Sequence, residues 1–210
     1  MTSSNATSPA ATATSPRPGQ RVAVIIGSTR PTRICPGIAR WVRDAAQAES
    51  PLRYDLIDLA EINLPFLDEP LKAALGQYQH EHTRAWSRLV GACDGFIFVF
   101  PQYNWGYPAP LKNALDFLYH EWHGKPVSYV TYGTRGGNKG AEQLRGVLAG
   151  LKMRELDQHL EVIITDHDVD DDWQLRDLDA VMRPYGADIA RIDAQMVEAL
   201  ENTHASPVRR

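Results

Sequence analysis

The sequence predicts an α/β fold in which five strands form a doubly wound parallel sheet with helices on both faces. Short apolar runs alternate along the chain with segments whose apolar residues recur at helical spacing. Three of these runs end in loops rich in glycine or polar residues. Strands that alternate with helices pair in parallel, and right-handed crossovers place the helices on both faces of the sheet.

The first half of the predicted domain contains two strands and two helices. The strands are the apolar runs at 22–26 and 54–59. One helix begins near Pro36, which suits a first helical turn because its nitrogen has no hydrogen to donate. A second helix begins near Thr83, after a long connection that contains two prolines.

The second half continues the alternation. In order, we expect a strand at 95–100, a helix that carries Leu111, Leu115 and Leu118, a strand at 126–132, a helix from about Asn138, a strand within 160–165 and a terminal helix broken near Pro184. No internal repeat interrupts this order. One domain therefore accounts for the chain from residue 20 to residue 203.

Both ends of the chain are expected to be tails. Residues 1–19 consist almost wholly of Ser, Thr, Ala, Asn and Pro, and such a segment cannot bury enough apolar surface to offset the entropy of ordering. We predict a disordered tail there and a short second tail at 204–210. A transit peptide is a weaker alternative for the first tail because Arg17 is its single arginine.

Composition limits the possible partners and compartments. The net charge is −4 and no long basic stripe occurs, so no nucleic-acid partner is expected. The sequence contains no apolar stretch long enough for a membrane span and no apolar secretory segment. Two cysteines without Cys-x-x-Cys spacing suit a reducing compartment, so we expect a cytoplasmic protein.

The loop after the first strand is a candidate anion site. Gly27 ends the strand, and the chain then enters a helix whose free N–H groups and dipole favour negative charge. Ser28 adds a hydroxyl, and Arg30 and Arg33 add positive charge. The loop matches neither the dinucleotide nor the triphosphate glycine pattern, so a monophosphate is expected. The alternative is a polar turn without a ligand.

The segment after the third strand combines amide and aromatic side chains. Gln102, Tyr103 and Asn104 can supply directed hydrogen bonds, and Trp105 and Tyr107 can supply aromatic walls. A planar cofactor needs both. The alternative is a solvent-exposed aromatic turn, which rarely places three aromatic side chains in water.

The loop after the fourth strand is rich in glycine. Gly133, Gly136 and Gly137 allow either positive φ or close approach of a ligand to the backbone. The helix that follows directs its amino end toward this loop and favours negative charge there. Arg135 can add to that charge or lie in solvent, and a flexible loop without a ligand is the alternative.

Together the segments Gly27-Ser28-Thr29-Arg30, Pro101-Gln102-Tyr103-Asn104 and Gly133-Thr134-Arg135-Gly136-Gly137 resemble those of a known family. The chain is similar over about residues 21–200 to the flavodoxin-like NAD(P)H-dependent FMN reductases, and within them to the fungal-type NAD(P)H:quinone reductases. The resemblance implies the strand order 2-1-3-4-5 and an FMN site. The implied cofactor-binding residues are Ser28, Arg30, Arg33, Pro101, Gln102, Tyr103, Asn104, Trp105, Glu121, Gly133, Thr134, Gly136 and Gly137.

The resemblance also implies a function. It predicts an FMN-dependent enzyme that takes electrons from NADPH or NADH and reduces quinones, azo compounds, chromate or free flavin by two-electron ping-pong transfer. The family forms homodimers with the flavin near the subunit contact, so a homodimer or a tetramer is expected. No catalytic residue is assigned because the flavin carries the redox chemistry. The alternatives are a flavodoxin-like FMN electron carrier without NAD(P)H turnover and a flavin-free protein.

Several other patterns carry less weight. In most family members the phosphate loop continues with Ser and Asn where this chain has Arg33 and Cys35, although Arg-x-Cys-Pro is typical of the fungal-type branch. The two histidines of His120-Glu121-Trp122-His123 are wrongly spaced for a zinc helix, and the acidic run at 166–172 lacks the glycine of a calcium loop, so no metal site is expected. Cys35 is either a reactive thiol beside arginines or a packed small residue, and packing is favoured.

Overall fold

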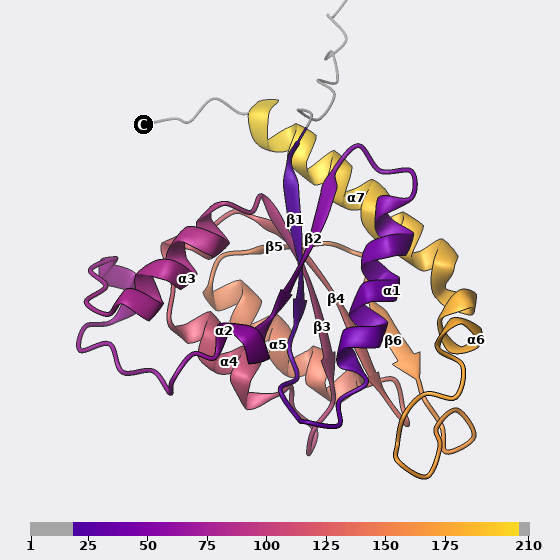
Figure 1. The fold of residues 1–210 in the computed structure, drawn as a ribbon. Coiled ribbons are helices and arrows are strands. Elements are labelled where there is room, and N and C mark those ends of the chain that lie inside the picture. The colour runs from indigo at the N-terminus through magenta and orange to yellow at the C-terminus, as the bar shows by residue number, and fades with distance from the viewer. Residues whose placement is uncertain (1–18, 206–210) are drawn as a thin grey trace, which may run out of the picture.

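The computed structural model describes residues 19–205, in which six parallel strands form one sheet (Figure 1). The strands are β1 (Arg21–Ile26), β2 (Arg53–Asp58), β3 (Gly95–Pro101), β4 (Pro126–Gly133), β5 (Arg154–Glu155) and β6 (Leu160–Ile163). Their order is β2-β1-β3-β4-β5, and β6 also pairs with β4. This confirms the predicted doubly wound topology. The predicted tails lie outside the described residues, apart from Gly19 and residues 204–205, which belong to the last helix.

The fifth position in the sheet is shared by two short strands. β5 pairs with the start of β4 at Pro126, whereas β6 pairs with its end from Val130 to Gly133. Between them, the Ser128 hydroxyl donates a hydrogen bond of 2.8 Å to the carbonyl of Gln158, which holds the interrupted segment against β4. The predicted fifth strand is β6, and it ends at Ile163, before the expected Thr165.

Helices cover both faces of the sheet (Figure 1). They are α1 (Cys35–Gln47), α2 (Leu59–Ile62), α3 (Glu81–Gly91), α4 (Ala109–Asp116), α5 (Asn138–Gly150), α6 (Leu178–Met182) and α7 (Gly186–Ala205), with 3₁₀ turns η1 (Ala73–Leu75), η2 (His120–Trp122) and η3 (Arg183–Tyr185). α1, α6 and α7 pack on one face, and α3, α4 and α5 on the other. No described helix is both long and apolar enough to cross a bilayer.

Most predicted helix positions agree with the structure. The expected break near Pro184 is confirmed, because η3 separates α6 from α7. α3 begins at Glu81, two residues before the expected Thr83. The prediction that Leu118 belongs to the helix after β3 is wrong, because α4 ends at Asp116; Leu118 is nevertheless buried in the same core.

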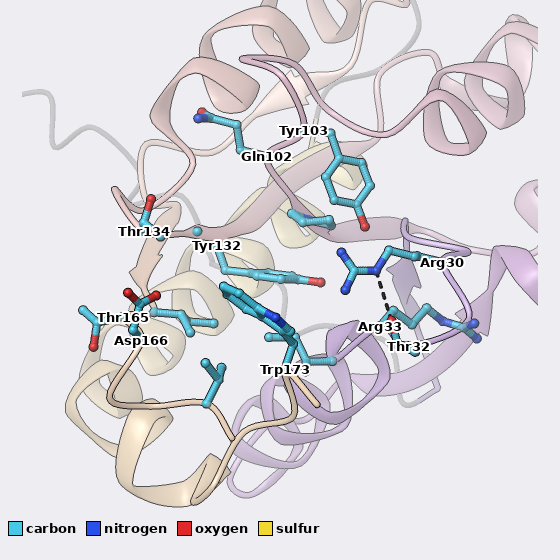
Figure 2. Close-up of a pocket in the computed structure, with 15 residues that line it drawn as sticks. Arg30, Thr32, Arg33, Gln102, Tyr103, Tyr132, Thr134, Thr165, Asp166 and Trp173 are labelled. Atoms are coloured by element: carbon cyan, nitrogen blue, oxygen red, sulfur yellow. Dashed lines mark hydrogen bonds between the residues drawn. The ribbon is translucent and has the colours of Figure 1, made fainter. Parts of the chain in front are cut away.

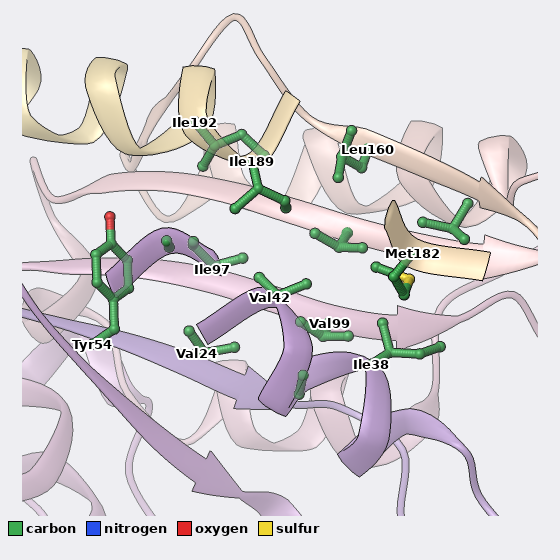
Figure 3. Packing of buried hydrophobic residues seen from close by; sticks show 14 of the residues in the cluster. Val24, Ile38, Val42, Tyr54, Ile97, Val99, Leu160, Met182, Ile189 and Ile192 are labelled. Atoms are coloured by element: carbon green, nitrogen blue, oxygen red, sulfur yellow. The ribbon is translucent and has the colours of Figure 1, made fainter. Parts of the chain in front are cut away.

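Each face of the sheet has its own apolar core. Figure 3 shows Val24 and Ile97 of the sheet facing Val42 of α1 and Ile189 and Ile192 of α7. Alternate strand residues such as Ile25 and Phe98 point to the other face and pack with Trp86 and Trp122. β3 is buried along its whole length, as expected for a central parallel strand. This packing fixes the carboxyl ends of β1, β3 and β4 at one edge of the sheet.

Both cysteines are free and buried. Burial raises the pKa of the Cys35 thiol to about 11, and its Sγ donates a hydrogen bond to the Val99 carbonyl. The alternative of a reactive Cys35 is therefore wrong, and the packing role is confirmed. The arginines nearby in sequence do not overcome the desolvation of the thiolate.

Candidate functional site

A cavity of about 320 Å³ opens at the carboxyl edge of the sheet, where loops from separate parts of the chain meet (Figure 2). It lies at the ends of β1, β3 and β4, where α/β sheets commonly bind ligands. Its lining is Arg30, Thr32, Arg33, Ile34, Pro101, Gln102, Tyr103, Tyr132, Gly133, Thr134, Ile164, Thr165, Asp166, Val169 and Trp173. The three predicted loops therefore contribute to one cavity.

The two arginines of the first loop are in different electrostatic situations. Arg33 forms an ion pair of 2.7 Å with Asp58 at the end of β2, and both side chains are largely buried, with 17% and 12% of their surface exposed. Arg30 donates from its Nε to the Thr32 hydroxyl at 3.2 Å (Figure 2) and forms no ion pair with any carboxylate within residues 19–205. Arg30 is thus the cation available to an anionic ligand.

Arg33 nevertheless keeps one unused donor. Its Nε is buried and has no hydrogen-bond partner among the described residues. A buried N–H of this kind is costly to leave unsatisfied, and a phosphate oxygen would satisfy it. This atom and the uncompensated charge of Arg30 fit an anionic group at this end of the cavity.

Ser28 does not line the cavity. It is fully buried, and its hydroxyl lies 2.9 Å from the Tyr103 hydroxyl. This hydrogen bond joins the loop after β1 to the loop after β3, and it places the Tyr103 ring on the cavity wall. Ser28 therefore positions Tyr103 in this structure.

Asn104 and Trp105 form the tip of a tight hairpin. The backbones of Tyr103 and Gly106 exchange hydrogen bonds of 2.8 and 2.9 Å, and the two residues between them have φ of 47° and 68°. Both central residues at positive φ are typical of a type I′ turn. Trp105 is 70% exposed at this tip, and neither central residue lines the cavity.

Gln102 connects the second loop to the third. Its Oε1 accepts hydrogen bonds from the backbone N–H groups of Lys139 (2.9 Å) and Gly140 (3.1 Å), which belong to the first turn of α5. The side chain thus satisfies donors that a helix cannot satisfy itself. Gln102 fixes the amino end of α5 beside the cavity.

Two glycines of the third loop are required by local packing. Gly136 and Gly137 have positive φ, and a Cβ on Gly137 would lie 2.8 Å from Thr131 Oγ1. A Cβ on Gly136 would lie 2.9 Å from the Cβ of Glu161. Of this loop, Gly133 and Thr134 line the cavity.

Glu121 lies away from the cavity. Its carboxylate accepts hydrogen bonds from the Tyr78 hydroxyl at 2.9 Å and the Ser87 hydroxyl at 2.6 Å. These contacts fasten η2 to α3 and to the segment before it. The carboxylate is thus committed to packing on the face opposite α1.

Sequence reasoning missed several lining residues, above all Tyr132, Asp166 and Trp173. Tyr132 ends the apolar run of β4 and resembles a core residue in sequence; burial raises the pKa of its phenol well above the ordinary value, so the hydroxyl stays protonated. Its position directly before Gly133 was the available signal. Asp166 and Trp173 come from the loop after β6, whose approach to the first loop depends on tertiary structure.

The cavity has an electrostatic polarity that suits a phosphorylated planar ligand. In Figure 2, Arg30 and Arg33 lie toward one end and Thr134, Thr165 and Asp166 toward the other, with the rings of Tyr132 and Trp173 between them. Cationic donors at one end can bind a phosphate, and the aromatic side chains can cover a ring system. The residues present therefore fit a flavin mononucleotide.

Comparisons with known proteins agree with this geometry. The model of the NADPH-dependent FMN reductase family matches residues 20–165. An NAD(P)H-dependent FMN reductase of Schizosaccharomyces pombe is 49% identical over 136 residues, which are 64% of this chain and 68% of that protein. An NAD(P)H-dependent FMN reductase of Saccharomyces cerevisiae is 47% identical over 144 residues, 63% of this chain and 75% of that protein.

More distant relatives share the fold. An NADPH:quinone oxidoreductase of Arabidopsis thaliana is 32% identical over 136 residues, 62% of this chain and 67% of that protein. The solved structure of a flavoenzyme NAD(P)H:(acceptor) oxidoreductase from Paracoccus denitrificans aligns with a TM-score of 0.65 at 20% identity and covers 87% of this chain and 98% of that one. Since the family model matches most of the chain and spans the three loops that follow β1, β3 and β4, the chain belongs to the NADPH-dependent FMN reductase family.

Proposed function

We propose that the 320 Å³ cavity binds FMN and that the chain uses it to pass electrons from NADPH or NADH to a quinone or a similar planar acceptor. The observation that carries this proposal is the meeting of the uncompensated Arg30 with the rings of Tyr103 and Tyr132 at the carboxyl edge of the sheet. Family membership supports the same cofactor and the same electron donor.

Each part of the cavity has a role in binding. Arg30 and the free Nε of Arg33 hold the phosphate, and Tyr103 and Tyr132 cover the ring system. Gln102 and Ser28 act indirectly in this proposal. The hydrogen bond of Gln102 positions α5, and that of Ser28 positions Tyr103. FMN, when bound, supplies the two-electron redox chemistry. The chain contributes binding, orientation and exclusion of water, and we assign it no general acid or base.

Donor and acceptor are proposed to use one site in turn. The chain has no Gly-x-Gly-x-x-Gly pattern that would give NAD(P)H a separate dinucleotide site. Donor and acceptor would then occupy the open face of the bound flavin one after the other, which gives ping-pong kinetics. Quinones, azo compounds, chromate and free flavin are the acceptor classes to compare.

We also propose a homodimer. Phe66, Leu67, Leu71 and Leu75, in the connection between α2 and α3, expose large apolar side chains, and Phe66 is 87% exposed. Phe66 also borders a second cavity of about 420 Å³, formed with α2, α4 and Thr29 of the first loop. A second copy of the chain that covers this surface would lie next to the flavin site.

We further propose a cytoplasmic location, which the two buried, unpaired cysteines support.

The test of the proposed function is reductive titration. The purified protein is loaded with FMN, freed of excess cofactor, deprived of oxygen and mixed with NADPH or NADH. We expect the yellow colour to bleach and to return when a quinone is added. A protein that binds FMN but stays yellow with both donors would be an electron carrier, and one that binds no FMN would refute the cofactor assignment.

A further inference from the structure

The loop between β6 and α6 supplies a cavity wall that the family model does not cover. The match to the family ends at residue 165, whereas Asp166, Val169 and Trp173 all line the cavity. Figure 2 shows the indole of Trp173 facing the cavity beside the ring of Tyr132. Trp173 therefore lines the site from a segment that lies outside the family match.

A small hairpin holds Trp173 in position. Val169 and Leu175 form an antiparallel bridge, and Asp170 Oδ1 accepts hydrogen bonds from the backbone N–H groups of Asp172 (3.0 Å) and Gln174 (2.8 Å). The acidic run that imitates a calcium loop in sequence thus includes a carboxylate that closes a turn. Asp177, which follows this run, caps α6 by accepting a hydrogen bond from the Ala180 N–H.

The backbone at position 173 disfavours a tryptophan. Trp173 has φ of 59°, in the left-handed region that disfavours bulky side chains, and its surface is 59% exposed. Residues held in sparsely populated φ/ψ regions cluster at active sites and ligand clamps. Contact with a ligand explains the indole better than stability does.

The hairpin is also tied to the phosphate loop. Gln174 Nε2 donates a hydrogen bond of 3.1 Å to the carbonyl of Thr32, which lies between Arg30 and Arg33. At the base of the hairpin, Arg176 Nε donates to the Val169 carbonyl at 2.7 Å. The position of the indole is thus fixed relative to the cationic end of the cavity.

We propose that Trp173 is a further cofactor-binding residue, whose indole stacks on the planar ring system of FMN on the same side as Tyr132. The inference rests on the proposed function, since it assigns a contact in the same site. Trp173 then extends the aromatic surface that Tyr132 provides on that side, and the other side of the ring system stays open to donor and acceptor. The Gln174–Thr32 hydrogen bond sets the distance of the indole from the phosphate position.

The experiment measures FMN affinity and thermal stability in parallel. Trp173→Gly removes the ring and also relieves the left-handed backbone, so the melting temperature of the apoprotein should stay equal or rise. FMN should bind about tenfold more weakly, as measured by titration of flavin fluorescence. The matched control is Lys152→Gly, which changes another residue at positive φ (55°) outside the cavity and should leave FMN affinity unchanged.

Two further variants separate the effect of the aromatic face on FMN affinity from the effect of side-chain volume. Trp173→Phe should retain most of the affinity, and Trp173→Leu should lose it, because leucine fills space without an aromatic face. If wild-type protein binds FMN and the Gly and Leu variants bind it equally well, the assignment of Trp173 is wrong while the proposed function stands. If wild-type protein binds no FMN, the proposed function itself fails.

Discussion

Trp105 illustrates how a single residue can be unfavourable for the fold and still suit a site. It occupies the second central position of the type I′ turn, with φ of 68°, and most of its surface is exposed. Glycine is the residue that this position favours on conformational grounds. A tryptophan here loses stability without gaining burial, so its role lies outside folding of the single chain.

The variant Trp105→Gly should therefore stabilise the protein. We expect a gain of about 1 kcal/mol in the free energy of unfolding, measured by urea denaturation, because the left-handed strain is removed and little buried surface is lost. Flavin affinity should fall if Trp105 covers the cofactor in the assembled protein. Asn104→Gly is the matched control and should give a smaller gain, since asparagine tolerates positive φ. A less stable Trp105→Gly protein would show that the indole packs on the fold.

At the scale of an element, α5 depends on a side chain from the β3 loop. Gln102 Oε1 satisfies the N–H groups of Lys139 and Gly140, and no other side-chain cap is present at this helix start. Gln102→Ala should lower the free energy of unfolding by about 1 kcal/mol, as loss of a helix cap does. Gln102→Glu keeps the acceptor oxygen and adds a negative charge that the helix dipole favours, so it should retain wild-type stability. Equal losses in both variants would refute the capping role.

The ionised carboxylate of Glu69 stabilises the connection before α3. Its carboxylate accepts hydrogen bonds from the N–H groups of Gln79 (2.8 Å) and His80 (3.0 Å). Burial opposes ionisation, but these hydrogen bonds outweigh it and lower the pKa from 4.5 to about 2. Because the folded pKa lies below the unfolded one, this contribution to stability is complete above pH 4.5 and is lost as the pH falls toward 2.

Glu69→Gln should reduce the decrease in the free energy of unfolding at acidic pH. The variant keeps an acceptor oxygen but cannot ionise, so its stability should change less between pH 4.5 and 2 than that of the wild-type protein. Urea denaturation across this pH range measures the difference. Glu49→Gln, a change at an exposed glutamate, serves as the control and should follow the wild-type profile. Parallel profiles for Glu69→Gln and wild type would show that the carboxylate does not stabilise the fold.

At the scale of the whole molecule, the exposed apolar side chains between α2 and α3 predict that two copies of the chain associate into a homodimer. Phe66→Asp should convert a homodimer into a monomer of 23.4 kDa in sedimentation experiments, because a charge would be buried at the contact. Ile163→Asp, at an exposed site on β6, should leave the dimer intact. A wild-type monomer, or dissociation by both variants, would contradict the proposed contact.

The sheet was predictable because the sequence patterns that indicate it lie within short segments of the chain. Apolar runs such as β3 and the helical spacing after each run determine a parallel α/β fold, and strand ends determine which loops share an edge. The site was predictable where loops follow these ends, as for Arg30 and Tyr103. Trp173 was missed because its approach to the cavity depends on how the last loop folds back, and the commitment of Glu121 to Tyr78 depends equally on tertiary contacts.

The central claim is that Arg30 holds the phosphate of FMN in the cavity, and binding of FMN and riboflavin to wild-type protein and Arg30→Ala tests it most directly. Riboflavin has the same ring system but no phosphate. Arg30→Ala should bind FMN at least about tenfold more weakly, with little change for riboflavin, because charge-assisted hydrogen bonds to the phosphate are lost. Arg135→Ala, at an exposed arginine outside the cavity, should change neither affinity. Equal losses of FMN and riboflavin, or no loss of FMN, in Arg30→Ala would contradict the claim.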